Sequence, residues 1–319
     1  MIEQAWNEYR GWARRARSLE AKTGRWNVWA MVMLVATAFL SAASGYFSAN
    51  LPDWLPRLLA SERFAQALAC AAAVASALSL YVGRQALAVG AESGWLRARA
   101  TAEAIKSECF RFAAGVGDYA PDKASEAESA TAFIERRKAL AARAAGDSLT
   151  PEDDPVGAAG DDRRPSRPMT DKWYLANRID GQIEFYRKGQ EKNERAYGRL
   201  QLWSFVAGAV IAAVSAVAAV YGAQLAAWTG ALTTAGAAVG AYGLAERQKY
   251  LAASYAALKA NLERTKERYE VGDVTLQALV TAAEDLMESE HAAWIDRMTK
   301  TIHAPPSPPQ QADGSQGSQ

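Results

Sequence analysis

The side chains that most often carry out catalysis are few in this sequence of 319 residues, and their spacing fits no catalytic site. The two histidines, His291 and His303, lie far from the two cysteines, Cys70 and Cys109. No group of histidine, cysteine and carboxylate residues has the spacing of metal ligands. Neither a nucleophile elbow nor a glycine-rich phosphate loop is present. We therefore expect no catalytic residue, no metal and no cofactor, and a protein that is not an enzyme.

Proton or ion transfer across a membrane is a second kind of chemistry, and the sequence argues against it as well. Three long runs lack any charged side chain: 26–52, 65–83 and 200–245. Ion-coupled transporters usually place an ionisable residue near the membrane midplane, and these runs offer none. Hydroxyl groups such as those of Ser44 and Thr234 could line a pore or bond to the backbone, and both alternatives stay open.

The overall charge gives no reason to expect nucleic acid as a partner. Lysine and arginine total 36 residues and aspartate and glutamate total 35, so the net charge is +1. Proteins that bind nucleic acid usually carry a clear basic excess. Two cysteines are also too few for a disulfide framework, and we expect free thiols in a reducing compartment.

The charge-free runs predict four membrane spans. About 20 helical residues cross a bilayer core, so the runs give spans at about 28–49, 65–83, 202–221 and 225–244. Aromatic residues such as Trp26 and Trp203 lie at span ends, where interface belts occur. The predicted fold class is an all-α membrane protein with two transmembrane helical hairpins, continued by long antiparallel helical arms in the cytoplasm.

Basic residues predict the orientation of these spans. Cytoplasmic segments next to spans are enriched in lysine and arginine. Arg14, Arg15 and Arg25 precede the first span, whereas the predicted outer loops hold only Arg57 and Arg63. We therefore expect a multi-pass protein of the inner (plasma) membrane, with both termini in the cytoplasm and the lipid bilayer as its first partner.

Heptad-like apolar seams, typical of coiled coils, predict how the cytoplasmic arms pack. The seam that follows the second span runs through Trp95, Ala98, Ala102, Ile105, Cys109, Phe112 and Val116. The last helix carries a stripe that includes Leu276, Val280 and Ala283, begins near an N-cap at Asp273, and is expected to fold back on the arms.

Composition divides the chain into two halves of similar helical plan. The predicted domains are 1–120 and 172–303, joined by a partly disordered linker at 121–171 and followed by a disordered tail at 304–319. The linker contains PEDDPVGAAGDDRRPSRP and the tail APPSPPQQADGSQGSQ. Such segments lack the apolar surface needed to fold by themselves.

Small residues recur on the last two spans at the four-residue spacing that lets helices approach closely in lipid. They serve either packing within one hairpin or an interface between subunits of a homo-oligomer. The positions are Gly208 and Ala212 on the third span and Gly236, Gly240 and Gly243 on the fourth.

Two stretches of the sequence carry a further pattern of aromatic and charged residues. The helix after the first predicted hairpin reads WLRARATAEAIKSECFRF, and the helix before the second reads YLANRIDGQIEFYRKGQEKNERAY. Both resemble a known family, the SMODS- and SLOG-associating two-transmembrane effector (SLATT) domains, so the chain resembles a tandem pair of such domains. The matching positions are Trp95, Arg99, Glu103, Lys106, Tyr174, Arg178, Gln182, Tyr186 and Trp294.

The resemblance implies a role that composition and spacing do not reveal. SLATT proteins are regarded as membrane effectors of prokaryotic conflict and antiphage systems, so this chain is expected to oligomerise and permeabilise the inner membrane when triggered through its arms. A cytoplasmic sensor or nucleotide-signalling protein is then a possible partner. The alternative is a non-conducting membrane scaffold or sensor that recruits partners through the cytoplasmic helices.

Overall fold

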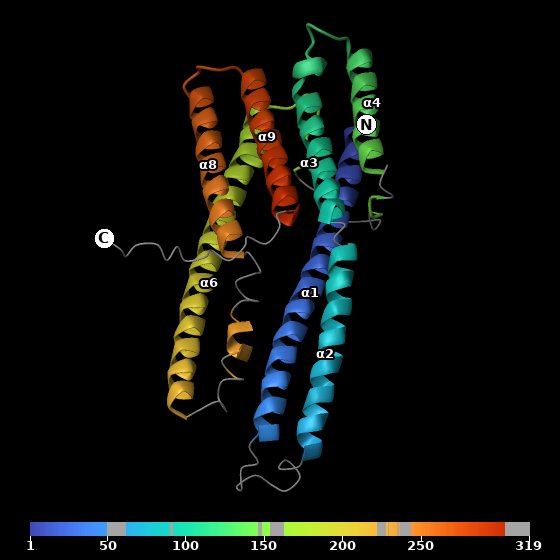
Figure 1. Ribbon diagram of the computed structural model, residues 1–319. Coiled ribbons are helices and arrows are strands. Elements are labelled where there is room, and N and C mark those ends of the chain that lie inside the picture. Colours follow the sequence, from blue (N-terminus) through green and yellow to red (C-terminus); the bar gives the residue numbers. More distant parts are fainter. Residues whose placement is uncertain are drawn as a thin grey trace, which may run out of the picture.

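The structure is a computed structural model that describes residues 1–49, 62–89, 92–145, 149–153, 163–221, 228, 230–234, 236 and 244–303, and within these residues it is helical without strands. A π-helical turn at Leu175–Ile179 joins α5 directly to α6. The helices are α1 (Ile2–Ala49), α2 (Glu62–Val89), α3 (Glu92–Ala114), α4 (Glu126–Ala145), α5 (Asp171–Tyr174), α6 (Asp180–Tyr221), α8 (Leu244–Glu270) and α9 (Leu276–His303) (Figure 1).

A helical bundle occupies one end of the molecule. It consists of α3, α4, α5, α8, α9, residues 2–23 of α1 and residues 180–199 of α6, and Figure 1 shows it in the upper half. One continuous cluster of buried residues forms its core, with Trp12, Phe110, Tyr174 and Leu262 among its largest side chains. Residues of α1 and α3 share this core with residues of α6, α8 and α9, so the two halves of the chain are packed together.

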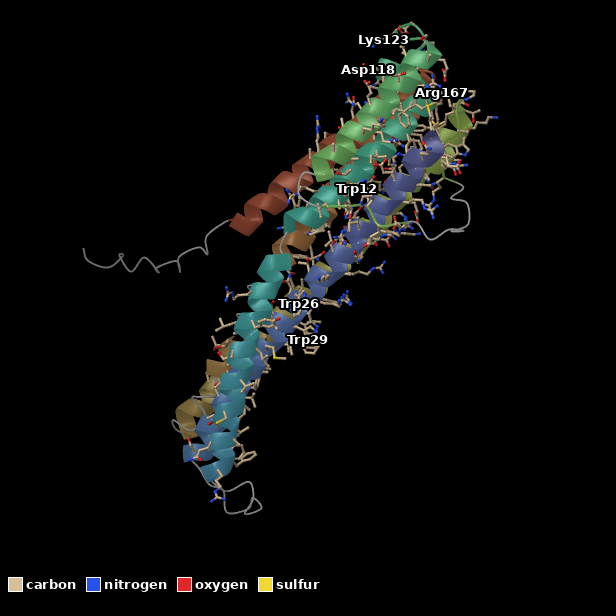
Figure 2. All side chains as sticks on the ribbon, turned by 90° about the vertical axis from the view of Figure 1, so that its right-hand side faces the viewer. Trp12, Trp26, Trp29, Asp118, Lys123 and Arg167 are labelled. Atoms are coloured by element: carbon tan, nitrogen blue, oxygen red, sulfur yellow. The ribbon has the colours of Figure 1, made fainter. Side chains whose placement is uncertain are left out.

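The opposite end of the molecule is apolar and has little protein around it. Residues 26–49 of α1, 65–83 of α2 and 200–221 of α6 are called the apolar ends below. α1 and α6 run without a break from the bundle into these ends (Figure 1). Figure 2 places Trp26 and Trp29 about midway along the molecule, between Trp12 in the bundle and the apolar tip.

Three of the described helices are long and apolar enough to cross a membrane, and they contain the first three predicted spans. In the most apolar 18-residue stretch of α6 no residue is buried, and in the corresponding stretches of α1 and α2 few residues are buried. The fourth predicted span, 225–244, lies mostly outside the described residues, although 230–234 is helical. Trp228 contacts Phe39 and Tyr46 of α1, with ring centroids 6.2 and 6.4 Å apart.

All seven residues of the predicted seam are buried. Six of them lie on α3, where their period places the side chains on one face of the helix and α1, α4 and α9 pack against that helix. Val116 follows the end of the helix. The polar residues Gln190 and Asn193 of α6 make their side-chain hydrogen bonds within their own helix. Asn193 donates to the Gly189 carbonyl at 2.7 Å and Gln190 to Glu194 at 2.9 Å, both within α6.

Two local predictions need correction or refinement. Thr275, and not Asp273, caps α9, because the Thr275 hydroxyl accepts from the Ala278 N–H at 3.3 Å. Asp273 instead accepts a hydrogen bond from Arg268 at 2.7 Å. The hydroxyls singled out in the spans bond to backbone carbonyls: Ser44 to Ala65 and Thr234 to Gly230, each at 2.9 Å.

Parts of the predicted linker at 121–171 are packed on the bundle. It contains α4, and the short segment 149–153 crosses α1, where the Glu152 N–H donates to the Gly11 carbonyl at 3.3 Å. The Met169 N–H donates to the Ala113 carbonyl at 3.2 Å. These segments gain order by docking on neighbouring helices, which their own composition does not predict. The predicted disorder at 154–162 and in the tail lies outside the described residues.

α6 and α8 pack tightly at Gly189. A Cβ atom there would lie 2.7 Å from two ring carbons of Tyr255, so glycine permits this close packing. We expect Gly189→Ala to lower the free energy of unfolding by about 1–3 kcal/mol, because overpacking displaces the ring. Thermal melting followed by circular dichroism in detergent measures the change.

Gly198 on the same helix is the matched control, since a Cβ atom there would meet nothing within 4 Å. Gly198→Ala should raise the melting temperature slightly, because alanine favours helix by about 1 kcal/mol over glycine. Equal melting temperatures for both variants would contradict the close packing at Gly189.

Candidate functional site: a buried ion pair beside a cavity

Tyr174 and Arg178 are brought into the bundle by the short helix α5 and the π-helical turn that follows it. Thr170 starts α5, because its hydroxyl accepts from the Trp173 N–H at 3.4 Å. Arg178 lies within the π-helical turn, a feature found frequently at functional sites. Both side chains are buried, with Tyr174 fully inaccessible and Arg178 3% exposed.

Arg178 forms a bidentate ion pair with Glu284 of α9. Its Nε donates to Glu284 Oε1 at 2.9 Å and a terminal nitrogen donates to Oε2 at 2.7 Å. The Tyr174 hydroxyl adds a third hydrogen bond to Oε1, at 3.1 Å. Burial alone would lower the pKa of Arg178, but the charge of Glu284 and its hydrogen bonds, with smaller contributions from Tyr174 and Glu103, together raise that pKa. Burial, together with Glu284, also raises the pKa of Tyr174 well above its ordinary value.

Aromatic rings join this pair to the first half of the chain. The Arg178 guanidinium lies over the Phe110 ring of α3, 4.5 Å from its centroid, a cation–π contact. Phe110 also meets Tyr174 edge to face at 6.0 Å and Trp6 of α1 at 5.9 Å. The ion pair is therefore a contact between the two halves, because its own residues come from the second half and its aromatic platform from the first.

A cavity of about 890 Å³ lies beside the ion pair. Its walls come from α1 and α3 in the first half, from the end of α4 in the predicted linker, and from the π-helical turn, α6, α8 and α9 in the second half. Six of the positions that resemble the SLATT family line it: Arg99, Glu103, Lys106, Arg178, Gln182 and Tyr186.

The family-matching residues of α3 interact along one wall of this cavity. Lys106 lies 3.6 Å from Glu103 and over the Tyr9 ring, 5.3 Å from its centroid. Arg99 interacts with Tyr255 of α8 through its positive charge and through a side-chain hydrogen bond. Trp95 lies near the beginning of α3 and packs in a small cluster with Leu96 and Leu251.

Other predicted positions lie elsewhere or outside the described side chains. Trp294 is on α9, but its side chain is not among those described. Gly208 and Ala212 are exposed on α6, whereas a Cβ atom at Gly236 would lie 3.3 Å from Ile211 Cδ1 of that helix. Gly240 and Gly243 lie outside the described residues.

Glu284 is the functional residue that the sequence analysis missed. It lies one helical turn after Val280 and next to Ala283, inside the apolar stripe of α9. A carboxylate in such a stripe is a recognisable signal, because glutamate is almost never fully buried unless it is paired. The sequence does not tell which cation pairs with it, since Arg178 is 106 residues away.

The fold and the site together define the class of protein. Within the described residues this is an all-α protein with three helices fit to cross a membrane and a packed bundle beside them. Residues 174–294 match the family described as SMODS and SLOG-associating 2TM effector domain 1.

The first half matches a different family. Residues 5–127 match a family described as protein of unknown function (DUF4231). The predicted SLATT resemblance is thus confirmed for the second half alone. No curated protein and no solved structure matches the chain. A two-transmembrane family and the apolar helices together indicate a membrane protein.

Removing one member of the buried pair should destabilise the bundle strongly. Glu284→Ala leaves the Arg178 charge buried without its partner, and we expect a loss of about 3–5 kcal/mol in unfolding free energy. Replacing both members, Arg178→Met with Glu284→Gln, should cost much less, because no buried charge remains. Melting of the two variants in detergent compares them, and an equal loss in both would refute the pairing.

The partly buried carboxyl group of Glu290 should make the stability of the bundle depend on pH. Burial raises its pKa, although a hydrogen bond from Ser254 and the Arg99 charge oppose this. A carboxyl whose pKa is higher in the folded state stabilises the fold below its ordinary pKa of about 4.3 and loses that contribution as pH rises. Glu290→Gln should therefore melt above the parent protein at pH 7.5 and match it near pH 4. A variant that melts lower at pH 7.5 would contradict this.

Proposed function

We propose that the chain is a membrane effector of a prokaryotic conflict system, which oligomerises and permeabilises the inner membrane when its bundle receives a trigger. The match to an effector family over residues 174–294 is the observation that carries this proposal. The uncovered apolar ends support it, because an effector that acts on membranes must present such a surface to lipid.

The proposed orientation places the bundle and both termini in the cytoplasm. Arg14, Arg15 and Arg25 lie on α1 at or next to the bundle, and the positive-inside rule assigns such segments to the cytoplasm. The first half follows the same helical plan as the second, with α1 and α2 paired and α3 leading back into the bundle (Figure 1). We therefore take it to be a second two-span domain of the SLATT type.

The outer face of α6 is the proposed contact between subunits. Gly208 and Ala212 are exposed there, and a Cβ atom at Gly208 would meet nothing within 4 Å. Small residues at this spacing let a second helix approach closely in lipid. Gly236 is already close to Ile211 in the same chain, so its part of the small-residue pattern serves packing within the hairpin.

Inducible expression in a bacterium, with membrane potential and entry of an impermeant dye as readouts, tests the proposal. The parent protein should depolarise the cell, and Gly208→Leu should abolish depolarisation at equal membrane abundance by blocking helix approach. Gly45→Leu on α1 is the matched control, since its Cβ position is equally open, and it should retain the activity.

Depolarisation that survives Gly208→Leu would refute the proposed subunit contact. No depolarisation at high abundance, together with specific co-purification of a partner, would favour the alternative of a non-conducting scaffold or sensor.

A further inference from the structure

One donor of the buried ion pair has no acceptor. Arg178 uses two of its nitrogens for Glu284, while its other terminal nitrogen is buried and has no hydrogen-bond partner. Buried polar groups are paired with few exceptions, and each exception needs an explanation. Arg178 also lines the 890 Å³ cavity. An acceptor that enters from the cavity, with a small movement of the Arg178 side chain toward it, would satisfy this donor.

The charges around the cavity favour an anion. Seven arginine and lysine side chains and five glutamates line it, and two of these cations are themselves paired with glutamates of the lining. Glu284 is held by Arg178 and Tyr174, Glu290 accepts from Ser254, and Glu288 accepts from Arg111, which is not part of the lining. Guanidinium groups suit carboxylate and phosphate oxygens, which they bind in a planar geometry.

Aromatic rings from both halves also line the cavity. Trp6, Tyr9 and Phe110 belong to the first half, and Phe185, Tyr186 and Tyr255 to the second. Small-molecule sites have volumes of about 300–1,000 Å³ and combine apolar walls with a few polar groups. Rings on facing walls offer stacking surfaces for a flat ligand.

We propose that this cavity binds an organic anion that carries a flat ring, with a phosphate or carboxylate group accepting from Arg178. Such a ligand contacts α3 on one side and α6 and α9 on the other, so it changes how firmly the two halves of the bundle are joined. In this respect the inference rests on the proposed function, since the ligand would then be the trigger that the bundle receives.

Titration of the purified full chain in detergent with 1-naphthyl phosphate and 1-naphthoate, followed by calorimetry, tests binding. The two compounds share a ring and an anionic group, and the tighter one identifies the phosphate or the carboxylate as the preferred group. Inorganic phosphate and 1-naphthol each lack one part, and both should bind at least about tenfold more weakly.

Gly181→Leu is the sharpest variant. Gly181 lines the cavity and its Cβ position meets nothing within 4 Å, so leucine fills space without a clash. This variant should lose about tenfold or more in affinity, while Gly198→Leu, which lies outside the cavity on the same helix, should bind like the parent. The double variant Arg178→Met with Glu284→Gln should also lose binding, because the donor is gone.

No saturable binding of either naphthyl compound, or unchanged affinity in Gly181→Leu, would overturn the inference. Binding is measured on purified protein without any conductance, so its failure leaves the effector proposal intact. Conversely, binding without depolarisation of cells would count against the proposed function and not against the site.

Discussion

Within the described residues, large apolar side chains along one end of α1, α2 and α6 are exposed, and this constraint decides where the rest of the molecule can lie. Fourteen of them are exposed, among them Trp29, Leu80 and Phe205. Exposing a large apolar side chain fully to water costs about 1.5–3 kcal/mol. With each of the fourteen roughly half exposed, the total cost in water is roughly 10–20 kcal/mol. That is as much as the whole stability of a typical fold. Lipid removes that cost. Because α1 and α6 continue into the bundle without a break, the bundle must then stand beside the membrane.

Inside the bundle, the buried ion pair between Arg178 and Glu284 imposes a second constraint on how the helices pack. Burying Arg178 and Glu284 is costly, and good geometry with additional hydrogen bonds is what makes such a pair tolerable. Tyr174 supplies the additional hydrogen bond and Phe110 the cation–π surface. This requirement fixes α5, the π-helical turn, α9 and α3 relative to one another. It also leaves a cavity next to the pair, where side chains of both halves converge and where a bound molecule would affect their contact.

The spacing of apolar and charged residues predicted much of the fold, and the family resemblance predicted part of the site. The buried seam of α3 follows from apolar spacing alone, and the three long apolar helices follow from the absence of charge. The resemblance to SLATT domains singled out Arg178 and Tyr174, but their partner Glu284 escaped, because pairing over more than a hundred residues leaves no local signal. The cap of α9 was misplaced for a different reason, since Asp273 and Thr275 are both good N-cap residues and only the turn geometry separates them.

The central claim is that the bundle lies in the cytoplasm with the apolar ends in the inner membrane. Lys123, at the far tip of the bundle in Figure 2, is exposed and suited to labelling. A Lys123→Cys variant in a Cys70→Ala background keeps the native Cys109, which is buried and whose pKa burial raises, so it should not react. A membrane-impermeant maleimide should label this variant in inverted inner-membrane vesicles and not in intact spheroplasts. Labelling in intact spheroplasts would contradict the account.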